Sequence, residues 1–163
     1  MRSDTDKAKE HSYGDAYDIL FSDFDRQAKL NILEIGVQKG ASLLAWKEYF
    51  PNATVTGIDI QDDRVYKSDD VKFIVSDIKE WRTDETFDII IDDGSHLKPE
   101  VLFAVIYFRH KLRKNGILVI EDVQDVGWVK EVRSLLANCK FGVIDLREKA
   151  GRHDDFLMII KNA

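Results

Sequence analysis

The sequence of 163 residues predicts an α/β fold, in which a mostly parallel sheet of seven strands has helices on both faces and ends in an antiparallel hairpin. Short apolar stretches rich in β-branched residues alternate with stretches whose apolar residues recur at helical spacing. A glycine-containing turn follows the first apolar stretch, as it does where open α/β sheets bind nucleotides. The last two apolar stretches have no helical pattern between them, which favours an antiparallel pair.

The opening segment is expected to form a helix, because its apolar residues recur every three or four positions. They are Tyr13, Tyr17, Leu20, Phe21 and Phe24. Five buried strands should follow, since five stretches are short, apolar and rich in β-branched residues. They are residues 31–36, 54–59, 71–75, 87–92 and 117–121. Each strand should lead into a helix, and Pro51 should end the first of these helices near Phe50.

Two of the expected connecting helices have a clear apolar face. The residues of the two faces are Leu97, Val101, Leu102, Val105, Ile106 and Leu112 in the first, and Trp128, Val132, Leu135, Leu136 and Cys139 in the second. Residues 141–146 and 156–161 should then form the hairpin at the sheet edge. Five β/α units closed by such a hairpin resemble the Rossmann-like sheet of class I methyltransferases.

Composition predicts one domain over residues 1–163, with a lid or helix segment at 1–26 and a catalytic core at 30–163. The net charge of −6 and the scattered basic residues argue against a nucleic-acid partner. No stretch of the sequence is long and apolar enough to span a membrane, no signal peptide is expected, and the single cysteine favours the reducing cytoplasm. The apolar opening helix on a small domain suggests a homodimer.

The turn after the first strand is the most informative motif. Gly36 allows a tight turn, Gly40 allows a ligand to approach the next helix, and Asp59 can accept hydrogen bonds from a ribose. A dinucleotide site uses G-x-G-x-x-G to hold a pyrophosphate, whereas this turn is G-x-x-x-G with Glu34 ahead of it. A carboxylate suits a ligand with sulfonium and ammonium charges, so we expect these four residues to bind S-adenosylmethionine. The alternative is a strand–turn–helix without a ligand.

Further cofactor contacts are expected at five positions. Asp77 and Ile78 follow the third strand, where an adenine would lie, although Asp77 could instead cap a helix. Asp92 ends the fourth strand and is also assigned to the cofactor. Lys7 and Tyr13 could fold over it, or they could belong to a mobile tail.

A second cluster of polar residues follows the fourth and fifth strands. Asp93, Glu121 and Asp122 lie at the carboxyl ends of neighbouring strands, which open onto the ligand crevice. Three converging carboxylates repel one another unless a cation such as Mg²⁺, Mn²⁺ or Ca²⁺ neutralises them. His96 follows Asp93 closely enough to act as a general base in the same pocket. The alternatives are a solvated turn with a helix cap for the aspartates and a backbone contact for the histidine.

At these residues the chain resembles the metal-dependent sugar O-methyltransferases of macrolide biosynthesis, the mycinamicin and macrocin group. The resemblance rests on Asp93-Gly-Ser-His96, on Glu121-Asp122, and on Thr5-Asp-Lys7 with His11-Ser-Tyr13 and Tyr17. It implies that Asp93, Glu121 and Asp122 bind Mg²⁺ and that His96 is the catalytic base. The family's enzymes carry additional segments that build the acceptor pocket and the oligomer.

The expected function is therefore Mg²⁺-assisted methyl transfer from S-adenosylmethionine to a hydroxyl of a sugar or other vicinal diol. A catechol-type or other small-molecule methyltransferase and a non-catalytic S-adenosylmethionine-binding module remain as alternatives. An NAD-dependent oxidoreductase is disfavoured by the glycine spacing. His153-Asp154-Asp155 could suggest a second metal site, but its place before the last strand favours a turn.

Overall fold

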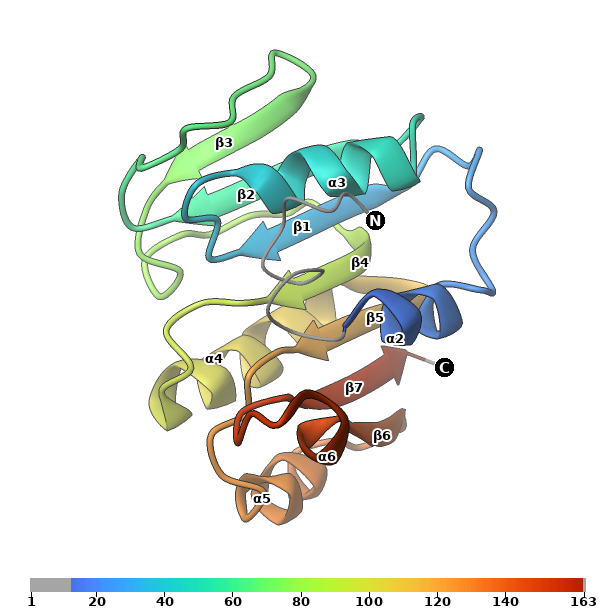
Figure 1. Ribbon diagram of the computed structural model, residues 1–163, viewed down its shortest axis with the longest axis vertical. Helices are drawn as coiled ribbons and strands as arrows, with labels where there is room; N and C mark the ends of the chain where they lie inside the picture. Colours follow the sequence, from blue (N-terminus) through green and yellow to red (C-terminus); the bar gives the residue numbers. More distant parts are fainter. Residues whose placement is uncertain (1–12, 163) are drawn as a thin grey trace.

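The computed structural model describes residues 13–162, and their strands form one seven-stranded sheet (Figure 1). The strand order across the sheet is β3-β2-β1-β4-β5-β7-β6. The strands are β1 (Asn31–Ile35), β2 (Thr54–Asp59), β3 (Val71–Val75), β4 (Phe87–Asp92), β5 (Leu112–Ile120), β6 (Cys139–Asp145) and β7 (Phe156–Asn162). The predicted α/β sheet is confirmed.

Strands β1 to β5 are parallel to their neighbours, whereas β7 runs antiparallel to both β5 and β6. The predicted hairpin is therefore present. The second strand of the hairpin, β7, lies between β5 and β6, so that β6 forms the edge of the sheet. All five parallel strands point their carboxyl ends to the same side, which places the loops after them next to one another.

Helices cover both faces of the sheet, as predicted. On one face, α2 (Tyr13–Leu20) and α3 (Ala41–Tyr49) contribute Tyr17 and Trp46 to a core that includes Ile32. On the other, α4 (Lys98–Phe108) and α5 (Trp128–Ser134) contribute Phe108 and Val132 to a core that includes Leu33. Consecutive residues of a strand point to opposite faces, so each buried strand supplies both cores.

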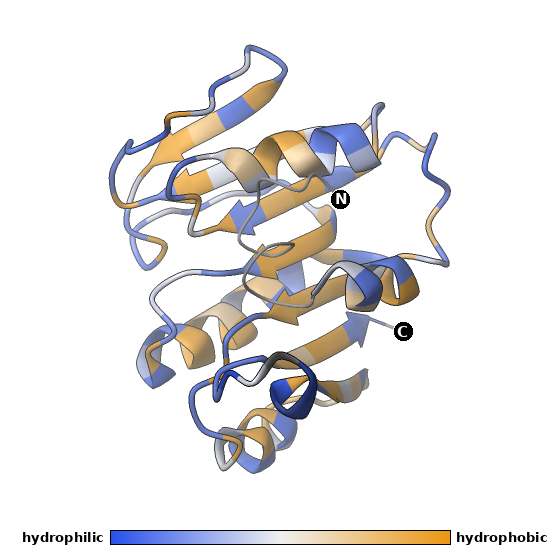
Figure 2. Ribbon diagram, in the orientation of Figure 1, coloured by the Kyte–Doolittle hydropathy of each residue, from blue (hydrophilic) through white to orange (hydrophobic). Residues whose placement is uncertain are grey.

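Hydropathy follows this arrangement. Figure 2 shows hydrophobic residues along the central strands and hydrophilic residues in the loops at their carboxyl ends. Within residues 13–162, none of the helices has both the length and the apolar character needed to cross a bilayer.

The expected helices after β2 and β3 are absent from the described segments 60–70 and 76–86. Segment 60–70 is largely polar and is held by other contacts. The backbone N–H groups of Val65 and Tyr66 donate to the carbonyl of Lys39 at 3.0 and 2.9 Å. This loop therefore packs against the glycine turn instead of forming a helix on the sheet.

Two predicted helices are shorter than expected. After α4, a 3₁₀ turn (η1, Arg109–Lys111) leads into β5, so that Leu112 begins a strand. Helix α5 ends at Ser134, and Asn138 adopts a left-handed backbone (φ 64°) that turns the chain into β6. Cys139 is therefore the first residue of a strand and not part of a helix face. The expectation that no helix separates the last two strands is wrong, because a short helix, α6 (Arg147–Ala150), lies inside the hairpin connection.

The carboxyl ends of β1 and β4 approach each other closely at Gly36. This residue has φ +81°, and a Cβ built on it would lie 2.0 Å from the carbonyl oxygen of Asp93. The backbone N–H of Asp93 donates to the carbonyl of Ile35 at 2.8 Å. The glycine turn that follows β1 therefore packs directly on the loop that follows β4.

Gly36→Ala should lower the free energy of unfolding by roughly 2–4 kcal/mol, because it combines a left-handed backbone penalty with a clash against backbone. Denaturant unfolding measures the change. Gly142→Ala in β6 is the matched control, since its added Cβ meets nothing within 4 Å. Equal stability of the two variants would contradict the close approach.

Candidate functional site

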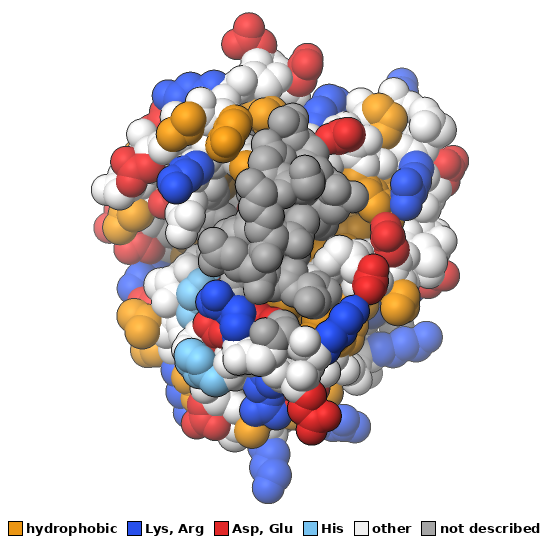
Figure 3. Space-filling view, viewed as in Figure 1, with side chains coloured by type: hydrophobic (Ala, Val, Ile, Leu, Met, Phe, Trp, Pro, Cys, Tyr) orange, Lys and Arg blue, Asp and Glu red, His pale blue; other side chains and the backbone are white. Residues whose placement is uncertain are grey.

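A cavity of about 1130 Å³ opens at the carboxyl ends of the parallel strands. The loops after β1, β2, β3, β4 and β5 line it, together with Arg152 and Asp154 from the connection between α6 and β7. On the face shown in Figure 3, acidic, basic and histidine side chains gather over the loops that follow β4 and β6. This cavity contains most of the side chains that the sequence singled out.

The glycine turn forms one end of the cavity. Gly36 and Gly40 both have left-handed backbones, and Gln38 between them has φ 46°. One carboxylate oxygen of Asp59, Oδ2, accepts the backbone N–H groups of Val37 and Gln38 at 2.8 and 2.9 Å. Asp59 lines the cavity and at the same time fixes the shape of the turn.

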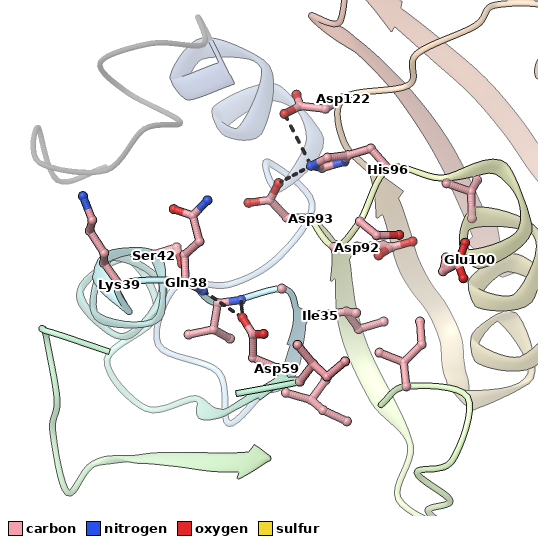
Figure 4. A pocket seen from close by; sticks show the side chains of 18 of the residues that line it. Ile35, Gln38, Lys39, Ser42, Asp59, Asp92, Asp93, His96, Glu100 and Asp122 are labelled. Atoms are coloured by element: carbon pink, nitrogen blue, oxygen red, sulfur yellow. Dashed lines mark hydrogen bonds and ion pairs between the residues drawn. The ribbon is translucent and has the colours of Figure 1, made fainter. Parts of the chain in front are cut away.

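Glu34 lies behind this turn and does not line the cavity. It is fully buried, and its Oε2 accepts a hydrogen bond from the hydroxyl of Ser42 at 2.9 Å. Ser42 does line the cavity (Figure 4). The carboxylate of Glu34 is thus placed one layer behind the surface that a ligand would touch.

Asp77 and Ile78 line the cavity after β3. Oδ1 of Asp77 accepts the backbone N–H of Lys79 at 2.8 Å, which stabilises a turn, and no helix follows in segment 78–86. Tyr66 lines the cavity as well. Sequence reasoning missed Tyr66, since it lies in a segment that was expected to be helical.

Asp92 lines the cavity and is buried. Burial raises the pKa of its carboxyl group to about 7, and repulsion from Asp93 acts in the same direction. A hydrogen bond from the backbone of Gly94 opposes this shift. Lys7, the other predicted cofactor residue, lies outside the described residues.

Asp93, His96 and Asp122 come together at the other end of the cavity, as Figure 4 shows. Nε2 of His96 lies 3.8 Å from Oδ1 of Asp93 and 3.9 Å from Oδ2 of Asp122. One ligand atom from each residue falls within 4.8 Å of the other two. Two carboxylates and an imidazole at this spacing can hold a divalent cation.

Unusual backbone conformations place two members of this cluster. His96 has φ 56° and Asp122 has φ 50°, in a region that residues other than glycine seldom occupy. Strained backbone of this kind is commonly retained where function requires a side chain to point in a set direction. The strain supports a functional role for both residues.

Glu121 differs from its neighbour in placement. It is buried, does not line the cavity, and accepts a hydrogen bond from the hydroxyl of Tyr17. The hydroxyl of Tyr13 donates to Asp122 in the same way. Burial, followed by the nearby carboxylates, raises the pKa of both phenols, so each stays protonated and remains a donor.

Tyr13 is fully buried and is not among the residues that line the cavity. Its expected contact with the cofactor stays a prediction. The structure brings Asp93, His96 and Asp122 together as expected, and it leaves the carboxylate of Glu121 one layer behind them. The role of Glu121 as a metal ligand stays a prediction.

Arg152 and Asp154 extend the cavity beside this cluster, and sequence reasoning did not single them out as site residues. Nε of Arg152 lies 3.3 Å from Asp154 and 3.7 Å from the buried Asp155. His153 and Asp154 form a turn, as predicted. The sequence analysis favoured a turn here over a metal site, and only the fold could reveal that this connection reaches the cavity.

Comparison with known proteins gives a match to the methyltransferase domain family over residues 33–123. The 8-demethyl-8-alpha-L-rhamnosyl tetracenomycin-C 2'-O-methyltransferase of Streptomyces olivaceus is 32% identical over 142 residues, which cover 78% of this chain and 37% of that protein. The mycinamicin VI 2''-O-methyltransferase of Micromonospora griseorubida is 32% identical over 132 residues, or 72% of this chain and 33% of that one.

Among solved structures, the MycE methyltransferase from the mycinamycin biosynthetic pathway, in complex with Mg, SAH and mycinamycin VI, superposes with a TM-score of 0.71. Its sequence identity is 24%, and the match covers 92% of this chain and 49% of that chain. At that identity the likeness establishes the fold alone. The chain spans about a third of the length of the curated relatives described above.

Asp59→Ala should speed hydrogen exchange at the amides of Val37 and Gln38 by about 10-fold or more, because each amide loses a charged acceptor. Exchange measured by NMR tests this. Asp77→Ala is the control: it should speed exchange at Lys79 only. Unchanged exchange rates at the amides of residues 37 and 38 in Asp59→Ala would show that the carboxylate does not stabilise the turn.

Proposed function

The chain belongs to the methyltransferase domain family, and from that premise we propose that it transfers a methyl group from S-adenosylmethionine to a hydroxyl of a sugar or other vicinal diol. One observation carries the proposal. The glycine turn, which Asp59 stabilises, and the cluster of Asp93, His96 and Asp122 face a single cavity. A donor bound at the turn and an acceptor bound at the cluster would therefore meet.

The relatives support the same reading, since both are named as O-methyltransferases and the name of one specifies a rhamnosyl group on its substrate. We propose that this chain also acts on a saccharide or small-molecule acceptor. The homodimer and the cytoplasmic location expected from the sequence stay predictions.

The cofactor end fits S-adenosylmethionine. The backbone of the turn between Gly36 and Gly40 would approach the methionine part, and Asp59 would accept hydrogen bonds from the ribose. Asp77 and Ile78 would lie against the adenine. Glu34, behind Ser42, and Asp92 add negative character near the positively charged ammonium and sulfonium groups.

The acceptor end fits a divalent cation. Asp93 and Asp122 would bind it through carboxylate oxygens, which are the ligands that Mg²⁺ and Mn²⁺ prefer. We keep Glu121 in the proposed ligand set, together with these two residues. A bound cation would lower the pKa of an acceptor hydroxyl and orient it.

His96 is the proposed general base. The methyl carbon forms a bond to the acceptor oxygen while its bond to sulfur breaks, and the sulfur leaves as a thioether with the electron pair. The hydroxyl proton passes to an imidazole nitrogen of His96 as the carbon–oxygen bond forms. Nε2 of His96 lies within 4 Å of both Asp93 and Asp122, so the proposed base is adjacent to the proposed cation site.

Removal of the metal with EDTA should abolish methyl transfer but leave the affinity for S-adenosylhomocysteine largely unchanged, because the cation orients the acceptor. Asp93→Ala should reproduce this effect in the presence of Mg²⁺. Calorimetry measures cofactor affinity, and a panel of sugar-diol and catechol acceptors measures turnover. Asp23→Ala, at an exposed ion pair with Lys161, is the control.

Full turnover in EDTA would contradict the proposed metal site, and absence of S-adenosylhomocysteine binding would contradict the proposed cofactor. A preference for catechols would replace the proposed acceptor class.

His96→Asn should lower turnover by roughly 10²–10⁴-fold, the usual contribution of a positioned base, while Mg²⁺ still binds. Asparagine is chosen because it tolerates the left-handed backbone at this position. His110→Asn, at an exposed position in η1, is the control. If Mg²⁺ affinity falls together with turnover, His96 is a metal ligand and the base must be sought elsewhere.

A further inference from the structure

Helix α2 places two tyrosines behind the proposed metal site. Tyr13 and Tyr17 are four residues apart, so their side chains lie on the same face of the helix. Both are fully buried, and neither lines the cavity. Each donates its phenol hydrogen to a carboxylate at the end of β5.

The ring of Tyr17 anchors the helix. It packs edge-on against Trp46 of α3, at 4.9 Å between ring centroids, and in a tilted arrangement against Phe21, at 5.1 Å. Its hydroxyl donates to Glu121. Aromatic packing and a buried hydrogen bond together fix the distance of α2 from β5.

Tyr13 lies one turn before this anchor and reaches Asp122. Its hydroxyl donates to Oδ1 of Asp122, whereas Oδ2 of the same carboxylate lies 3.9 Å from His96 in the cavity. Oδ1 of Asp122 thus faces the protein interior, whereas Oδ2 faces the proposed metal site. The hydrogen bond at Oδ1 restrains the rotation of the carboxylate, and with it the position of Oδ2.

This arrangement differs from simple support of the core. A phenylalanine at position 13 could fill the same apolar space, but it would leave the rotation of the Asp122 carboxylate without this donor. Groups that orient a metal ligand in this way contribute measurably to metal affinity.

Resting on the proposed function, we propose that Tyr13 is a positioning residue, which acts through Asp122 to orient a ligand of the divalent cation. Tyr17 holds the helix at the correct distance through Glu121. This proposal gives Tyr13 a role at the metal end of the cavity.

The test is Tyr13→Phe, with Tyr49→Phe as the matched control. Tyr49 also donates its hydroxyl to an aspartate, at 2.7 Å from Asp18, but on the exposed surface. Calorimetric titration with Mg²⁺, and Mn²⁺ titration followed by electron paramagnetic resonance, should give an affinity about 10–100-fold lower for Tyr13→Phe. The affinity for S-adenosylhomocysteine should remain that of the wild type in both variants.

Turnover provides a second readout. Because Tyr13 acts through a metal ligand and touches neither donor nor acceptor, saturating Mg²⁺ should restore most of the turnover of Tyr13→Phe. If this variant does not fold, the wild type is measured by near-ultraviolet difference spectroscopy. Mg²⁺ should then produce a tyrosine signal, since a cation on Asp122 withdraws charge from the acceptor of the Tyr13 hydrogen bond.

A wild type that binds Mg²⁺ with the same affinity as Tyr13→Phe would overturn this inference and leave the proposed metal site intact. A wild type that binds Mg²⁺ without a tyrosine difference signal would overturn it as well. A wild type that binds no Mg²⁺ would overturn both the inference and the proposed metal site.

Discussion

The whole site depends on how tightly the carboxyl ends of β1, β4 and β5 are joined. The N–H of Asp93 donates to Ile35, and the N–H of Glu121 donates to Asp92, at 2.8 and 2.9 Å. Gly36 permits this contact because any larger residue would meet the backbone of Asp93. The glycine turn and the carboxylate cluster are therefore held in a fixed relation by backbone hydrogen bonds, which side-chain motion alone cannot change.

Buried negative charge is the second constraint. Within the described residues, the carboxylates of Glu34, Asp92, Glu121, Asp122 and Asp155 are buried. A buried carboxylate is costly unless donors surround it. Ser42, Tyr17 and Tyr13 donate to three of them, and a raised pKa partly neutralises Asp92. The donors come from α2 and α3, so these helices stabilise buried carboxylates in addition to covering the sheet.

Much of the fold could be predicted from the sequence, because buried parallel strands are short apolar runs and the glycine turn has fixed requirements. Apolar spacing was a weaker guide where a helix stops. Leu112 and Cys139 continue the helical spacing, yet a 3₁₀ turn and the left-handed Asn138 end the helices before them. The missing helix in segment 60–70 reflects backbone contacts with Lys39 that no local pattern encodes.

A position on the cavity was predictable where residues end a strand or come just after one, as Asp59, Asp93 and Asp122 do. The hydrogen bond from Tyr13 to Asp122 could not be predicted, because sequence alone could not show that α2 packs behind β5. Arg152 reaches the cavity from a distant hairpin connection, through topology and not through a motif. Long-range contacts of this kind depend on the assembled sheet.

The central claim is that donor and cation share one cavity, with the cation at Asp93 and Asp122. Anomalous diffraction from crystals grown with Mn²⁺ and S-adenosylhomocysteine tests it most directly. The account predicts a manganese peak within coordination distance of both carboxylates, with the thioether sulfur in the same cavity and the ribose on Asp59. A manganese peak away from Asp93 and Asp122, or S-adenosylhomocysteine bound outside this cavity, would contradict it.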